Sequence, residues 1–258
     1  MPKPNIVRLR KVASALRKHA RTMSGFVRWS KATSKMYPPE ANTFLLGVIL
    51  DRSVQWQRAW DAAEWICKIL GKKDDVAALW TAIAEMEPVR LRGFLRYGYG
   101  GKAFHRHYKT FSNLLPQAAN HLLELYSGDP RKIWNNQTDV QKVKKRLEEI
   151  PGIGPALANF AVLCLARDYG LLGGKKARQQ LDVKPDMHVQ RVFYRAGLVP
   201  RGAKPQDVVN AARQLAPDFP ASLDVPAWDI GRNWFRPRHP GCLECPIGGV
   251  CPRVGLEN

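Results

Sequence analysis

Apolar residues recur at helical spacing along most of the chain, and no stretch alternates as a half-buried strand would. Residues 43–70 show this pattern clearly, as an apolar helix, a polar turn near 51–55 and a second amphipathic helix. The same spacing predicts further helices over 74–86, 89–96, 102–126 with a break at Pro116, 140–149, 155–169, 188–196 and 205–215. The sequence therefore predicts an all-α protein.

The first thirty-six residues are rich in lysine and arginine and contain no acidic residue. An organelle transit peptide and a basic surface helix share this composition. One helical face is formed by Val7, Val12, Leu16 and Met23. This phasing favours a basic surface helix, which the Tyr-Pro-Pro-Glu run at 37–40 is predicted to end.

The chain has 41 Lys and Arg against 22 Asp and Glu, a formal net charge of +19. This excess indicates a polyanionic partner, with nucleic acid first. A hydrophobic content of 45%, with eight Trp, indicates a packed core rather than a basic tail. The sequence contains no run of about eighteen apolar residues, which a membrane-spanning helix would need. Because the N-terminus is too charged for a secretory signal, we expect an intracellular protein, in a nucleoid or a nucleus, that does not associate with membranes.

Residues 150–154 read Ile-Pro-Gly-Ile-Gly and separate two predicted helices. The proline and glycines predict a tight turn, and Pro155 suits the first turn of the next helix, so the motif is helix–hairpin–helix. Because glycine lacks a Cβ, a phosphate can approach the N–H groups that begin the second helix. Such contacts position a protein on the nucleic-acid backbone. The predicted contact residues are Pro151, Gly152, Ile153, Gly154 and Ala156.

Asp186 follows a proline and precedes a predicted helix, in the run Asp-Met-His-Val-Gln-Arg-Val. A carboxylate at this place is a helix N-cap, which holds it fixed and favours its ionised form. A fixed carboxylate can stabilise positive charge that develops on a bound substrate. We therefore interpret Asp186 as a catalytic residue that also caps a helix.

Three cysteines, Cys242, Cys245 and Cys251, lie close together near the C-terminal end. Clustered cysteines in an intracellular chain favour a metal over a disulfide. Cys67 and Cys164 lie among apolar helical residues and are predicted core positions. The sequence therefore predicts a metal-binding loop in the C-terminal part of the chain.

From about Phe44 to Cys251 the hairpin, the Asp186 segment and the cysteines come in one order, and the chain resembles the helix–hairpin–helix DNA glycosylase superfamily, endonuclease III-like branch. The resemblance implies a two-lobed helical fold. One lobe is 43–169, with the hairpin motif at 140–169, and the other combines 1–42 with 170–258. It also implies base-excision repair of damaged or mismatched bases in double-stranded DNA by a monomer. Asp182 lacks the His-Val-Gln-Arg-Val run that follows the family's carboxylate, so we interpret it as a loop residue.

Bifunctional members carry a lysine two residues after the second hairpin glycine, which forms a Schiff base with the sugar. Ala156 stands there, so the resemblance implies a monofunctional glycosylase in which water attacks. Lys175 and Lys176, in an insertion at 170–182, are alternative nucleophiles for a bifunctional glycosylase and lyase. Otherwise they are solvated phosphate contacts. A non-catalytic DNA-binding or damage-sensing protein on the same scaffold is the alternative of another class.

When a base flips out of the DNA stack, a protein side chain fills the gap that it leaves. The resemblance implies that this side chain comes from the turn at 50–56. The candidates are Arg52, Ser53 and Gln55, and the alternative is a plain polar turn. Adenine-excising relatives need a second acid on the preceding helix, where this chain has Gly47. The expected substrates are therefore bases that leave without such an acid: uracil or thymine, oxidised pyrimidines and alkylated bases.

The three clustered cysteines match the last three of the family's iron–sulfur loop, and Phe235 replaces the first. Clusters normally need four thiolates. Three alternatives follow: a [4Fe–4S] cluster with a non-cysteine fourth ligand, for which His239 is nearest; zinc held by His239 and the cysteines; or a metal-free loop. The loop is expected to present arginines to phosphates. The further expected DNA contacts are His188, Arg191, Arg236 and Arg238.

Overall fold

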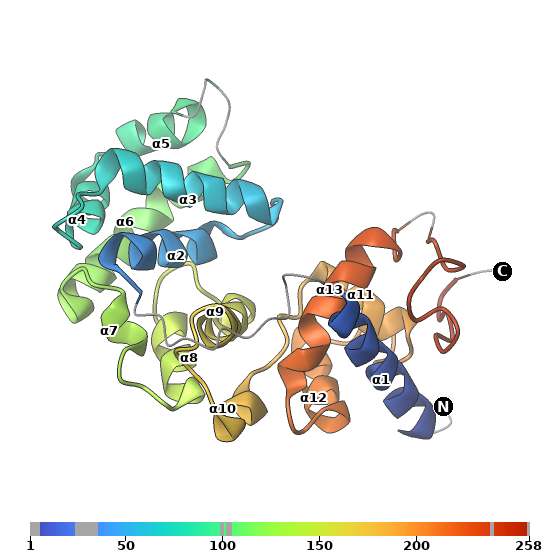
Figure 1. Cartoon of the computed structure of the whole chain (residues 1–258). Coiled ribbons are helices and arrows are strands. Elements are labelled where there is room, and N and C mark those ends of the chain that lie inside the picture. The colour runs from blue at the N-terminus through green and yellow to red at the C-terminus, as the bar shows by residue number, and fades with distance from the viewer. Residues whose placement is uncertain (1–5, 24–35, 99–100, 102–104, 238–239, 257–258) are drawn as a thin grey trace. The chain divides into compact units, whose positions relative to one another are not determined.

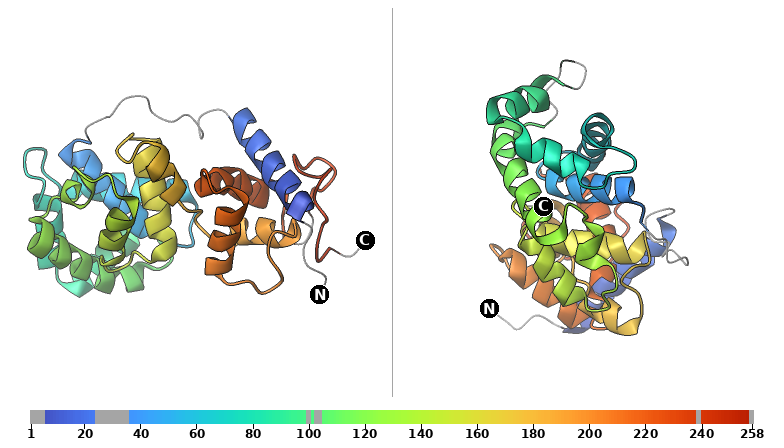
Figure 2. Two further views of the ribbon diagram at one scale, coloured as in Figure 1. Left: turned by 90° about the horizontal axis from the view of Figure 1, so that it is seen from below. Right: turned by 90° about the vertical axis from the view of Figure 1, so that its left-hand side faces the viewer.

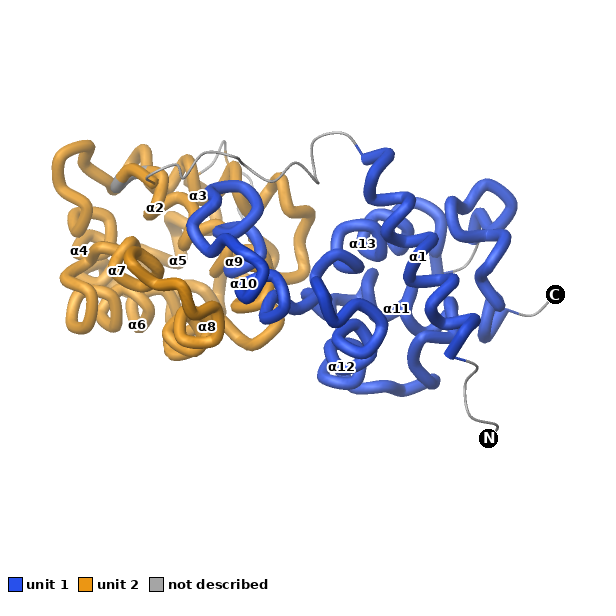
Figure 3. Tube along the Cα trace, turned by 60° about the horizontal axis from the view of Figure 1, so that its bottom comes forward, with its two compact units in different colours: residues 1–32, 162–258 blue, residues 33–161 orange. Residues whose placement is uncertain are grey.

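The computed structural model describes residues 6–23, 36–98, 101, 105–237 and 240–256. In these ranges the chain forms α-helices and one 3-10 helix, with no strand, which confirms the all-α prediction. Two compact units are present, Met1–Ala32 with Val162–Asn258 (unit 1) and Thr33–Ala161 (unit 2), coloured separately in Figure 3. None of the described helices is both long and apolar enough to span a membrane.

Unit 2 is built around an apolar helix, α2, which contacts α3 along its length. Helix α2 is buried on every side, as in Leu45, Leu46 and Ile49, the pattern of a helix at the centre of a core. Figure 1 shows α3 beside it, with α5 beyond α3. The helices are α2 (Pro38–Leu50), α3 (Trp56–Leu70), α4 (Ala78–Glu85), α5 (Pro88–Tyr97), α6 (Tyr108–Tyr126), α7 (Arg131–Trp134), α8 (Val140–Glu148) and the start of α9 (Pro155–Arg167).

One predicted helix start and one predicted helix break were wrong. The Pro-Pro pair at 38–39 begins α2, so this helix starts before the predicted residue 43. Proline suits this place because the first helical N–H groups have no intrahelical acceptor. Pro116 does not break α6, which continues through it. Packing of α6 against α4 and α5 supports the helix across the missing N–H.

Unit 1 joins the N-terminal helix to the last third of the chain. Its elements are α1 (Ile6–Thr22), the end of α9, α10 (Lys175–Gln180), α11 (Met187–Arg195), α12 (Pro205–Leu215), the 3-10 helix η1 (Pro220–Leu223) and α13 (Asp224–Asn233). Figure 2 shows α1 beside α12 and α13. The predicted basic helix is therefore present, and Val12 and Leu16 enter the core. Val7 is exposed and Leu9 is buried in its place.

Candidate active site and hairpin surface

Asp186 caps α11, as predicted. Its Oδ1 accepts hydrogen bonds from the main-chain N–H groups of His188, at 2.8 Å, and Val189, at 2.9 Å. Among the described residues no group donates to Oδ2. One carboxylate oxygen is thus fixed by the positive end of a helix, and the other is free to face a ligand.

The residues after Asp186 divide between the site and the fold. His188 is half-buried, and its Nδ1 has no hydrogen-bond partner among the described residues. Arg191, a predicted phosphate contact, donates from Nη1 to the carbonyl oxygens of Gly231, at 3.3 Å, and Phe235, at 3.1 Å. Its guanidinium therefore holds the end of α13.

Asp182 has a structural role in unit 1. It is 1% exposed, and its two oxygens accept from Nε and Nη2 of Arg213, both at 2.7 Å. A bidentate pair of this kind is strong and geometrically specific. Asp182 is therefore committed to α12, which leaves Asp186 as the available carboxylate of this segment.

The hairpin lies in unit 2, and its two glycines differ. Gly152 has a φ of 99°, and an added Cβ would lie 2.5 Å from Cδ2 of Leu114. Gly154 is exposed, and a Cβ there would meet no atom within 4 Å. The fold itself thus requires a glycine at position 152. At position 154 the missing side chain leaves open space beside the start of α9, where the first N–H groups have no acceptor within the helix. Ile153 is buried and anchors the turn.

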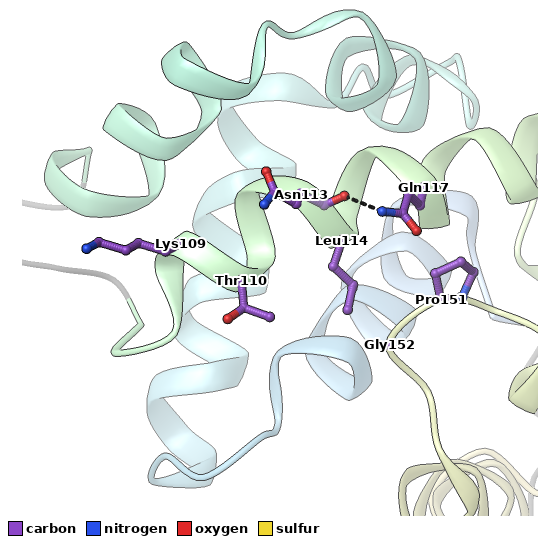
Figure 4. A pocket seen from close by; sticks show the side chains of 7 residues that line it. All are labelled: Lys109, Thr110, Asn113, Leu114, Gln117, Pro151 and Gly152. Carbon is purple, nitrogen blue, oxygen red and sulfur yellow. Dashed lines mark hydrogen bonds between the residues drawn. The ribbon is translucent and has the colours of Figure 1, made fainter.

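An open groove of about 650 Å³ runs between the hairpin and α6. Its α6 side presents Lys109, Thr110, Asn113 and Gln117, and Leu114 points toward Gly152 (Figure 4). The Gln117 amide donates to the carbonyl oxygen of Asn113 at 3.0 Å. A mainly polar wall, with Lys109 at one end, therefore borders the hairpin.

The turn between α2 and α3 exposes all three candidate gap-filling residues, Arg52, Ser53 and Gln55. Ser53 adopts the left-handed conformation, with a φ of 59°. The turn begins beside a buried histidine that the sequence analysis missed, His105. No spacing in the sequence signals this contact, because it joins residues 55 positions apart.

His105 ties the start of this turn to the segment before α6. Its Nδ1 accepts the main-chain N–H of His107 at 3.0 Å. Its Nε2 therefore carries the proton and donates to the carbonyl oxygen of Leu50 at 3.0 Å. Burial lowers the pKa of His105 to about 4. The imidazole is thus neutral, and its two hydrogen bonds connect the start of the turn to the segment before α6.

The candidate lyase residues are exposed. Lys175 and Lys176 form the first turn of α10, after Gly174 at a φ of 94°. In the described part of the chain, neither lysine is hydrogen-bonded or ion-paired to Asp186. Ala156, at the family's lysine position, lies in the first turn of α9.

The C-terminal loop is entered through a tightly held segment. Phe235 is 2% exposed and belongs to the core of unit 1. The Arg195 guanidinium lies 5.9 Å from the centre of its ring. Arg195 also donates to the carbonyl oxygens of Arg236, at 3.0 Å, and Pro237, at 3.3 Å. The Arg236 side chain is exposed.

The cysteines of the loop differ in exposure: Cys245 is buried, and Cys242 and Cys251 are half-buried. No three potential metal ligands come together within the described ranges. The position of the family's first cysteine is filled by a core phenylalanine, Phe235. These residues therefore do not fit a four-thiolate cluster. His239, the candidate ligand, and Arg238, a candidate phosphate contact, lie outside the described residues.

Three solved structures share the fold over nearly their whole length. A trapped endonuclease III–DNA covalent intermediate, an estranged-adenine complex, has a TM-score of 0.66 and 15% identity, covering 95% of this chain and 96% of that one. A non-covalent endonuclease III–DNA complex has a TM-score of 0.65 and 16% identity, over 95% of each chain. A thermostable thymine-DNA glycosylase has a TM-score of 0.61 and 16% identity, over 96% and 97%.

No protein-family model and no curated protein matches the sequence. The three-dimensional match therefore shows the fold alone. It is the helical fold of endonuclease III, which the thermostable thymine-DNA glycosylase shares.

Proposed function

We propose that this protein is a monofunctional DNA N-glycosylase of base-excision repair. The observation that carries the proposal is the carboxylate of Asp186, with Oδ1 held by two helix N–H groups and Oδ2 without a protein donor. The endonuclease III-like fold supports the same class of reaction. The exposed glycine of the hairpin supports a phosphate contact.

In the proposed reaction, the bond between C1′ of the sugar and the base nitrogen breaks, and the electron pair leaves with the base. Positive charge then develops on the sugar ring, and the fixed negative charge of Asp186 stabilises it. Water adds to C1′ and gives up a proton, which passes to the released base or to solvent. Because position 156 is alanine, no amine competes with water at the hairpin.

The proposed partner is double-stranded DNA that contains a damaged or mismatched base. A net charge of +19 and the polar groove wall beside the hairpin, which includes Lys109, support it. Binding should weaken steeply as salt rises, by roughly 0.9 units of log–log slope for each phosphate neutralised. A flat dependence on salt would contradict a nucleic-acid partner.

For the C-terminal loop we propose a metal-free fold held by Phe235, Arg191 and Arg195. Elemental analysis of protein purified without oxygen tests it. Less than stoichiometric iron and zinc, with full DNA affinity after chelation, is expected. Stoichiometric iron would support the [4Fe–4S] alternative, and stoichiometric zinc the alternative with three cysteines and a histidine.

The activity test uses a panel of duplexes, each with one modified base: uracil or thymine opposite guanine, an oxidised pyrimidine, or an alkylated purine. Product strands are analysed with and without alkali. Base release from at least one duplex is expected. Tight binding without release from any duplex would favour a non-catalytic damage sensor on the same scaffold.

A further inference from the structure

Asp224 is a buried carboxyl group that the proposed reaction does not use. It is the first residue of α13 and is 6% exposed. Burial raises its pKa to about 7, and the charged groups that face it belong to Asp186, Lys184 and Arg167, with the Cys164 thiol also close. Because burying a carboxyl group is unfavourable unless it is bonded, its contact indicates its role.

Asp224 is bonded to the turn that leads to Asp186. Its carboxylate accepts the main-chain N–H of Lys184, which lies 40 positions away in the sequence. The carbonyl oxygen of Lys184 in turn accepts the N–H of Asp186 at 2.7 Å. Pro185, between them, is buried and restricts the backbone. A short turn is thus tied to Asp224 at one end and ends at Asp186.

The other side of Asp186 is tied to the same helix. A Cβ added to Gly231 in α13 would lie 2.6 Å from the carbonyl oxygen of His188. Helix α13 therefore lies directly against the first turn of α11. Both chain segments that flank Asp186 are thus held by α13, one by a hydrogen bond and the other by close packing.

We propose that Asp224 is a positioning residue for Asp186, an inference that rests on the proposed glycosylase reaction. By holding the N–H of Lys184, its carboxyl group fixes the turn that aims the free oxygen of Asp186. An ionised carboxylate accepts this hydrogen bond more strongly than a neutral acid. The positioning therefore strengthens as Asp224 loses its proton.

The test compares single-turnover base release and DNA affinity in wild type, Asp224→Asn and Asp224→Ala. Asparagine keeps an acceptor for the Lys184 N–H, whereas alanine removes it. Asp224→Ala should slow base release by about 10- to 100-fold at unchanged DNA affinity, and Asp224→Asn by less than about fivefold, because small displacements of reacting groups are costly. A wild-type rate in Asp224→Ala would overturn the proposal.

The pH profile separates positioning from general stability. The wild-type rate should rise with pH through about 7 as Asp224 ionises, and the profile of Asp224→Asn should be flat there. Asp182→Asn is the matched control, since it neutralises a second buried carboxyl group, which is paired with Arg213. It should lower stability without changing the profile. Identical profiles in wild type and Asp224→Asn would contradict the proposal.

Amide hydrogen exchange gives a readout that does not depend on activity. The amides of Lys184 and Asp186 should exchange faster in Asp224→Ala than in wild type or Asp182→Asn. This result would support the positioning role even if wild type released no base, in which case the proposed function alone would fail. Unchanged exchange in Asp224→Ala would overturn the positioning role.

Discussion

Trp60 fills the space that a side chain at Gly47 would need. A Cβ added to Gly47 would lie 2.7 Å from the Cε3 ring carbon of Trp60. The missing side chain thus lets α2 and α3 pack closely. A second acid at this position, which adenine-excising relatives need, has no room. The contact between Trp60 and Gly47 is thus a structural reason to expect that the excised bases leave without being protonated by a second acid.

Two helical glycines give a matched test of this packing. Gly47→Ala should destabilise the protein by about 1–3 kcal/mol, because the added methyl group meets the Trp60 ring. Gly93, inside α5, has no atom within 4 Å of an added Cβ, so Gly93→Ala should stabilise by about 0.5–1 kcal/mol. Urea unfolding measures both, and a Gly47→Ala protein as stable as wild type would contradict the packing argument.

The hairpin glycines should separate stability from binding. In Gly152→Ala the alanine would have to adopt the left-handed backbone conformation of the glycine, and its methyl group would clash with Leu114. The substitution should therefore destabilise the protein by about 1–3 kcal/mol. Gly154→Ala should leave stability nearly unchanged and weaken DNA binding, because its methyl group stands where a phosphate would approach. Thermal unfolding and equilibrium binding check both. Unchanged DNA affinity in Gly154→Ala would remove this glycine from the proposed interface.

His105 should make stability depend on pH. Its folded pKa, about 4, lies below its ordinary value of 6.5. The stabilisation is therefore complete above 6.5 and is lost as the pH falls toward 4, with about 2 kcal/mol lost at pH 5. Urea unfolding at pH 7 and pH 5 should show this loss in wild type and in the control His107→Gln, and a smaller one in His105→Gln. Equal losses in all three would contradict this role of His105.

Elements with a local signal were predictable from the sequence. Signals within a few neighbouring residues predicted the hairpin turn from its glycines, the Asp186 cap from its place before a helix, and the 205–215 helix from its periodicity. Helix α13 was missed because Pro226 and Gly231 interrupt its pattern, and packing against α11 compensates. Asp224 and His105 act on main-chain groups 40 and 55 positions away. Only the folded chain brings such partners together.

The strand-cleavage test concerns Lys175 and Lys176. Because both are exposed on α10 and position 156 is alanine, we expect product strands to stay intact until alkali or heat is applied. Borohydride should trap no covalent protein–DNA adduct. An adduct that disappears in Lys175→Ala or Lys176→Ala would instead establish a relocated Schiff-base lysine and a bifunctional enzyme.

The central claim is that Asp186 carries the chemistry, and its most direct test is single-turnover base release by Asp186→Asn beside Asp182→Asn. Asparagine removes the negative charge while an oxygen remains to cap α11. We predict that base release falls by at least about 100-fold in Asp186→Asn at equal or tighter DNA affinity. Asp182→Asn should keep its rate. Wild-type turnover by Asp186→Asn would contradict the account.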